Sequence, residues 1–382
     1  MNKSSEIFIL VTLTLSIFFI SLVSLSGNVQ RLGVVLFILL SFFILKKNEL
    51  NVDIRIVAIV IFLMFISITR FIYSYVYETW LQEDNENFIL SYILNFSLYF
   101  FFSLIVNNMI RFNSELISKS LFVVILCHLF LFYIQFVSVY VSGYFIDYVK
   151  FFTGEESRYM TYLSQLGPLK YRASGGYIEP STYAGCIIVL LLTYELTSET
   201  VCNKIRWLAV SSIFLTFSSA AVVFGTIYLF SKLKNSISSF KLYGCLILGA
   251  FVVIVSVLFF YEQLILIFNS PTLLMRIELV NYILNRETDL LLIGPGLFSL
   301  ENELFILSSG DGLGELRLAS INDLGLGILL FIKLGVIGLG LYLLSFFFVK
   351  NKTDYICITL TKLSYMHPLF ILALVSLFRN KN

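Results

Sequence analysis

The stretch 7-IFILVTLTLSIFFISLVSLS-26 contains no charged residue and is long enough for one membrane crossing. An α-helix needs about 20 mostly apolar residues to cross the ~30 Å hydrocarbon layer of a bilayer. The short charged start, MNKSSE, makes this region similar to a secretory signal peptide. Its apolar part is too long for one, however, and no small-residue cleavage site follows it. We therefore expect a retained first membrane span.

The composition of the whole chain agrees with this expectation. Hydrophobic residues make up 58% of the 382 residues and charged residues 13%. Soluble domains are about 45–50% apolar and roughly 25% charged. Because backbone groups in lipid must satisfy their own hydrogen bonds, we expect the apolar runs to be helices. The short alternating segments of a transmembrane barrel are absent from the sequence.

These runs predict an all-α integral membrane protein with about 11–12 transmembrane helices in a single domain, residues 1–382. Ser218 and Ser219 mark a bend between the seventh and eighth runs, and Pro368 interrupts the last run, which favours two short segments there. The expected spans are 7–26, 32–45, 54–73, 88–107, 119–143, 182–195, 206–218, 219–231, 240–260, 323–349 and 355–378.

The distribution of charge predicts an orientation for these spans. If the N-terminus is cytoplasmic, the short cytoplasmic loops carry more basic than acidic residues, as the positive-inside rule requires. Two long loops, about 144–181 and 261–322, then lie on the outer side. The second loop is longer than connections that have no role of their own usually are. Within it, 272-TLLMRIELVNYILN-285 has apolar residues at helical spacing, so we expect an amphipathic helix on the membrane surface.

Arginines in these outer loops run against the orientation rule and therefore need an explanation. A guanidinium group binds phosphate with two parallel hydrogen bonds and keeps its charge. For Arg158, Arg286 and Arg317, neighbouring acids offer a simpler explanation, and Arg286 is followed by Glu287 and Asp289. Arg172 has no acid within six residues, and Arg276 does not face Glu278 on a helix. We therefore favour Arg172 and Arg276 as anion-binding residues.

The segment 172-RASGGYIEPS-181 leads directly into an apolar run. Gly175 and Gly176 allow a positive φ and a close approach of a ligand. Pro180 suits the first turn of a helix, and Glu179 precedes it, where a carboxylate is favourable. The segment is also consistent with a plain capped loop.

The second long loop ends in a comparable way. After the tight turn 294-GPG-296, the segment beginning 320-SINDLGLGILLF-331 enters an apolar run in which Asn322 and Asp323 can cap a helix. Asp323 is also placed to accept a proton. Lys333 lies about three turns further along, where a charge needs a partner.

In this order, the motifs resemble the bacterial O-antigen polymerase (Wzy) and O-antigen ligase family. They are R-x-x-G-G-Y-x-E-P-S at Arg172, the hairpin 215-LTFSS-219, R-x-E at Arg276, 294-GPG-296, and N-D-x-G followed by Gly335 and Gly338. The similarity covers about residues 160–345.

The resemblance implies an enzyme of the bacterial inner membrane with its active site on the periplasmic face. Such an enzyme transfers a glycan from undecaprenyl diphosphate to the non-reducing end of another lipid-linked repeat unit, without a metal or other cofactor. It implies diphosphate binding by Arg172, Arg276 and, more weakly, Arg317. The candidate bases are Asp323 and Glu179, with no side-chain base as the remaining option. Its expected partners are the undecaprenyl-diphosphate-linked oligosaccharide, membrane lipids, and a chain-length regulator and flippase of the same pathway.

Other functions stay open at this point. The ligase branch of the family is expected to carry a His-Asn pair where this chain has Asn322 and Asp323. This difference favours the polymerase. A transporter of lipid-linked oligosaccharides is a different class, but no internal repeat is visible. The five cysteines lie in or beside apolar runs without a C-x-x-C motif, which argues against disulfides and zinc. A net charge of +2 gives no indication of nucleic acid, and we expect none as a partner.

Overall fold

A computed structural model describes residues 3–24, 27–45, 85–157, 172–233, 281–297 and 325–379, together with 52, 57, 61–62, 64–70 and 72. Within these residues every regular element is helical, which confirms the all-α prediction. The helices are α1 (Lys3–Ser21), α2 (Asn28–Ile44), α4 (Asn85–Phe112), α5 (Ser114–Val137) with the π-helical turn η2 (Ser138–Ser142), α6 (Tyr148–Thr153), α7 (Pro180–Thr197), α8 (Asn203–Leu215), α9 (Ser219–Leu233), α13 (Thr288–Ile293), α15 (Leu326–Phe348), α16 (Lys352–Thr359) and α17 (Pro368–Arg379).

Four described helices are long and apolar enough to cross a membrane: Ile93–Phe112, Ser114–Ser142, Pro180–Thr197 and Leu326–Phe348. Shorter apolar helices cover Ser5–Ser21, Asn28–Ile44, Ala220–Lys232 and Pro368–Arg379. The described residues are therefore compatible with a membrane protein. The expected span 240–260 and most of 54–73 lie outside the described residues, as does most of the amphipathic helix expected at 272–285.

Two local predictions about helix ends are confirmed. α8 ends at Leu215 and α9 begins at Ser219, with Phe217 between them at a φ of 52°. The C-terminal apolar run forms two helices, α16 and α17. Arg379 at the end of α17 donates to the backbone oxygen of Asn107 in α4 at 2.8 Å.

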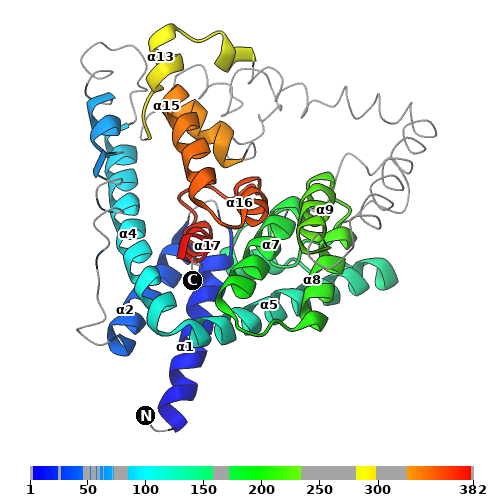
Figure 1. Cartoon of the computed structure of the whole chain (residues 1–382). Coiled ribbons are helices and arrows are strands. Elements are labelled where there is room, and N and C mark those ends of the chain that lie inside the picture. The colour runs from blue at the N-terminus through cyan, green and yellow to red at the C-terminus, as the bar shows by residue number, and fades with distance from the viewer. Residues whose placement is uncertain are drawn as a thin grey trace, which may run out of the picture. The chain divides into compact units, whose positions relative to one another are not determined.

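The chain divides into two compact units, each described here by itself. Unit 1 comprises Met1–Ala58, Ile93–Tyr228 and Ser345–Asn382, and unit 2 comprises Ile59–Tyr92 and Leu229–Leu344. Of the residues of α7, which belongs to unit 1, 83% are buried, against 33–39% in the other three long apolar helices of the chain. α7 is accordingly central to the unit and packs against α5, α8, α16 and α17 (Figure 1).

Aromatic side chains fill the space between α5 and α7. The ring of Tyr183 stacks on that of Phe132 at a centroid distance of 4.6 Å, and both side chains are fully buried. The Tyr183 hydroxyl donates to Oγ of Ser212 in α8 at 2.8 Å. A buried tyrosine needs such a partner, so Tyr183 fixes α7 against both neighbours.

Candidate anion-binding site before α7

The loop before α7, residues 172–179, is folded into the interior of unit 1. Ala173, Ser174 and Tyr177 are fully buried, and the N–H of Tyr177 closes a turn by donating to the carbonyl of Ser174 at 3.1 Å. Gly175 has a φ of 58°, and a Cβ there would lie 3.4 Å from the ring of Tyr183. Gly176 does not have a positive φ. Only Gly175 therefore requires glycine for its backbone angle.

Gln135 of α5 satisfies the buried backbone of this loop. Its Oε1 accepts from the N–H groups of Ser174 at 2.7 Å and Gly175 at 2.8 Å. Its Nε2 donates to the carbonyl of Ile146 at 2.7 Å. A buried amide left without a partner costs about 1–3 kcal/mol, so this single side chain makes the burial of the loop possible.

His128, which also belongs to α5, supports the same loop. Its Nε2 lies 2.7 Å from Oγ of Ser21 and 3.3 Å from the hydroxyl of Tyr177. Its ring stacks on Phe18 at 4.9 Å. With no exposed surface, His128 is a hydrogen-bonded packing residue.

Glu179 occupies the N-cap position of α7, with Pro180 in the first turn, as expected. Its side chain makes no capping hydrogen bond. Instead, Oε2 lies 3.5 Å from Nζ of Lys362 and accepts from Oγ of Ser181 at 3.3 Å. Lys362 belongs to the link between α16 and α17, and its side chain is 13% exposed. The carboxylate that the sequence suggests as a base is therefore paired with an ammonium group.

Arg172 lies close enough to Glu179 to feel its charge. Burial lowers the pKa of the Arg172 guanidinium, and the charges of Glu179 and Tyr140 oppose that shift. One terminal nitrogen of Arg172 donates to the carbonyl of Phe217 at 3.5 Å. The buried Nε has no hydrogen-bond partner within the part of the chain that the structure describes. Glu179 thus pairs with Lys362 and also interacts through its charge with Arg172, and two cations near one carboxylate suit the binding of an anion.

An apolar groove follows α5 in the same unit. It has a volume of about 640 Å³. Its walls come from α5, η2 and α8: Leu126, Leu129, Phe130, Tyr133, Ile134, Val137, Ser138 and Leu208. Beyond Ser138, the ring of Tyr140 lies 6.3 Å from that of Phe217, the residue whose carbonyl Arg172 contacts. The groove itself lies along α5, η2 and α8.

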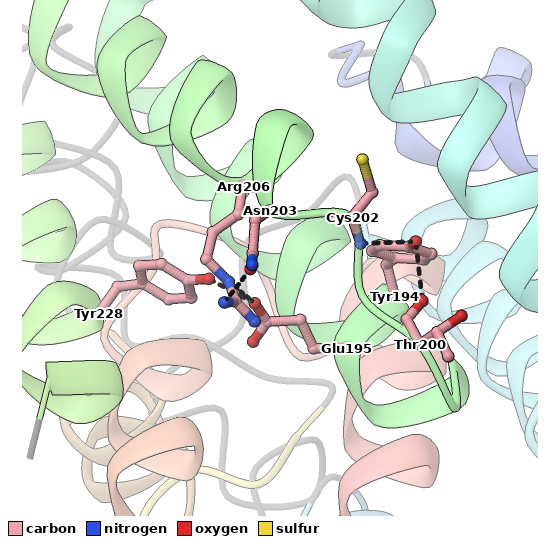
Figure 2. A network of polar contacts seen from close by, with 7 residues as sticks. All are labelled: Tyr194, Glu195, Thr200, Cys202, Asn203, Arg206 and Tyr228. Atoms are coloured by element: carbon pink, nitrogen blue, oxygen red, sulfur yellow. Dashed lines mark hydrogen bonds and ion pairs between the residues drawn. The ribbon is translucent and has the colours of Figure 1, made fainter. Parts of the chain in front are cut away.

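The opposite end of α7 carries a second polar network, shown in Figure 2. Oε1 of Glu195 accepts from Nε of Arg206 at 2.7 Å and from the hydroxyl of Tyr228 at 2.6 Å. Arg206 also donates to Oδ1 of Asn203 at 2.9 Å. The Glu195 side chain is only 7% exposed. This network joins α7, α8 and α9, so α7 is held by polar contacts at both ends.

The remaining predicted site residues, Arg276, Arg317 and Asp323, lie outside the described residues. Of the five predicted site residues, the structure thus places Arg172 and Glu179, which it brings together. Lys362 was missed as a site residue. Its one signal is that it is a charge within the apolar run 355–378, where a partner is needed.

Within the described residues no group of His, Cys, Asp and Glu side chains could hold a metal ion. Cys127, Cys186, Cys202 and Cys357 are free thiols. No protein-family model matches the chain, and there is no significant match among curated proteins or solved structures.

Proposed function

We propose that the chain is a membrane glycosyltransferase that polymerises glycan repeat units carried on undecaprenyl diphosphate. The observation that carries the proposal is the arrangement of Arg172, Glu179 and Lys362 at the start of α7. A guanidinium with a buried, unpartnered Nε beside a carboxylate and a second cation suits a diphosphate group. The order of motifs that resembles the O-antigen polymerase family supports the same substrate.

The chemical step joins two lipid-linked glycans. The oxygen of an acceptor hydroxyl forms a bond to the anomeric carbon of the donor sugar, while the bond from that carbon to the diphosphate oxygen breaks. The electron pair stays on the departing undecaprenyl diphosphate. Arg172 stabilises the negative charge that grows there, which is the largest contribution that a fixed cation can make.

The acceptor hydroxyl loses its proton during this step. The charge of the Glu179 carboxylate acts on Arg172, and in our scheme this carboxylate takes the proton. Lys362 pairs with Glu179, so a positive charge lies beside the carboxylate. The cluster would therefore bind the diphosphate of the donor and receive the proton of the acceptor at the same place. Asp323 is the alternative base, on the resemblance alone.

The lipid part of the substrate needs an apolar surface close to the charged cluster. We assign this role to the groove along α5 and α8, because it is lined mainly by apolar side chains and lies in the same unit as Arg172. Polyprenyl chains gain about 0.8 kcal/mol for each buried CH₂ group, so even partial insertion helps to hold the donor. We place the enzyme, with about 11–12 spans, in the bacterial inner membrane with the cluster on the periplasmic face.

The test is a chain-extension assay with the purified full-length protein in detergent. The probe is undecaprenyl-diphosphate-linked repeat unit from the bacterium that encodes the chain. We expect a ladder of longer glycans from the wild type, none from Arg172→Gln, and a normal ladder from the exposed control Lys204→Gln. Absence of a ladder with the wild type, or transfer of the lipid across a vesicle membrane without bond formation, would overturn the proposal.

A further inference from the structure

A second pocket of unit 1 lies at α6, in a segment that the proposed chemical step does not use. Its volume is about 640 Å³, which is within the range of small-molecule sites. Aromatic rings and one carboxylate form most of its wall: Tyr144, Phe145, Tyr148, Phe151, Phe152 and Asp147. We call it the aromatic pocket. The side chains of Tyr144 and Phe151 are 68% and 80% exposed, so a ligand could cover their rings.

Hydrogen bonds within the chain fix the backbone around this pocket. Oδ1 of Asp147 accepts from the N–H of Lys150 at 3.1 Å, and Oδ2 accepts from the N–H of Ser157 at 3.1 Å. The hydroxyl of Ser138 donates to the carbonyl of Tyr144 at 2.8 Å. The wall is thus formed by the chain itself, and a preformed site loses less entropy when a ligand binds.

The chemistry of the wall suits a sugar better than an alkyl chain. A carboxylate offers about four acceptor positions, and the two backbone bonds of Asp147 occupy one on each oxygen. The other positions can accept from sugar hydroxyls. Burial raises the pKa of the Tyr148 hydroxyl, which therefore keeps its proton and can donate. An alkyl chain would displace water from Asp147 without supplying a donor, which is unfavourable.

The composition of the wall also separates this pocket from the diphosphate site. None of the described residues that line it is basic. The aromatic rings offer broad apolar faces to the C–H groups of a sugar ring, while the carboxylate and the tyrosine hydroxyls fix its orientation. The pocket therefore fits the glycan part of a lipid-linked substrate.

The pocket and the loop before α7 share two neighbours. A Cβ on Gly176 would lie 3.9 Å from a side-chain carbon of Leu131 and 3.9 Å from one of Phe152, and both residues line the pocket. Gln135 makes a second connection, because it binds the carbonyl of Ile146 in the pocket wall and the N–H groups of the loop. All these residues belong to unit 1.

We propose that the aromatic pocket is a glycan subsite that binds sugar rings of the lipid-linked substrate beside the loop carrying Arg172 and Glu179. The inference rests on the proposed function for the identity of the glycan. Binding to the pocket can be measured without any transfer reaction, so the two can fail separately.

The binding test uses the full-length protein in lipid nanodiscs, because maltoside detergents carry sugars of their own. The probe is the repeat-unit oligosaccharide of the bacterium that encodes the chain, released from its lipid and titrated by saturation-transfer NMR. Tyr144→Leu and Phe151→Leu each keep an apolar side chain but remove a ring face. The Kd should rise by roughly twofold to tenfold in each variant.

Phe43→Leu is the matched control. Phe43 is an aromatic residue of α2 in the same unit, is 87% exposed and does not line the pocket, so the Kd should not change. In the chain-extension assay, Tyr144→Leu and Phe151→Leu should raise KM for the lipid-linked unit by the same factor as Kd. Because a subsite binds ground state and transition state alike, kcat should change little.

Absence of binding to the wild type, or an equal Kd for the wild type and both pocket variants, would overturn the subsite. A lower unfolding midpoint in all three variants with an unchanged Kd would show that the rings serve only as an aromatic belt at the membrane interface, and would overturn it as well. If the wild type binds the oligosaccharide through this pocket but forms no ladder, the subsite stands and the proposed polymerisation fails. A ladder with a Kd that is insensitive to Phe151→Leu gives the reverse result.

Discussion

The ammonium group of Lys362 lies 3.5 Å from the carboxylate of Glu179, although one residue opens α7 and the other lies between α16 and α17. This contact adds a second cation to the surroundings of Arg172. It also connects the C-terminal helices to the proposed site, a connection that no local sequence pattern indicates.

We predict that Lys362→Met weakens donor binding. The change removes one positive charge next to Glu179. The carboxylate then interacts more strongly with Arg172, so the guanidinium is less available to the diphosphate. The KM for the lipid-linked donor should rise by roughly tenfold. Because the Lys362 side chain is only 13% exposed, the change should also lower the free energy of unfolding. Lys204→Met, on an exposed lysine of the same unit, is the control. An unchanged KM would remove Lys362 from the site.

The conformation of the loop before α7 gives a second prediction. Gly175→Ala places a Cβ at a φ of 58° and 3.4 Å from the ring of Tyr183. Gly143 has a similar φ of 70°, but a Cβ there meets nothing within 4 Å. Both substitutions should cost about 1–2 kcal/mol for the left-handed backbone.

Only Gly175→Ala should also displace the loop and reduce chain extension. The measurements are the unfolding midpoint in detergent and the rate of ladder formation for both variants. Equal activity of Gly175→Ala and Gly143→Ala would show that the position of this loop does not matter for the reaction.

The network at the far end of α7 supports a prediction about stability alone. Arg206→Met leaves the nearly buried carboxylate of Glu195 without its cation, which costs about 3–5 kcal/mol. The double variant Glu195→Gln with Arg206→Met should regain part of that loss, because no buried charge remains. The measurement is the free energy of unfolding, with Lys204→Met as the reference. If the single variant is as stable as Lys204→Met, the network in Figure 2 does not hold the three helices together.

The features that the sequence predicts correctly all depend on local patterns. Apolar runs, Pro180, and the break near Ser218 are determined by residues close to one another in the chain. The burial of the loop before α7 was not expected, because polar loops usually lie on the surface. It depends on Gln135, an uncharged residue in an apolar run that gives no sign of its role before the helices are placed.

The ion pairs show the same difference between contacts that are local in the chain and contacts between distant segments. Arg206 pairs with Glu195, which lies eleven residues earlier in the chain, across the turn between two helices. Glu179 with Lys362 and Arg70 with Asp289 join segments far apart in the chain. Long-range pairs of this kind follow from how helices pack, which a single sequence does not specify.

The central claim is that the guanidinium group of Arg172 holds the diphosphate of the donor. It is tested most directly by Arg172→Lys in the chain-extension assay with undecaprenyl-diphosphate-linked repeat units. This substitution keeps the charge but not the planar, two-pronged donor geometry. The hydrogen bond of Arg172 to the carbonyl of Phe217 is long, at 3.5 Å, so its loss should leave the fold intact. The account predicts a loss of at least about tenfold in the rate of ladder formation with an unchanged unfolding midpoint. A ladder formed by Arg172→Lys at the wild-type rate would contradict it.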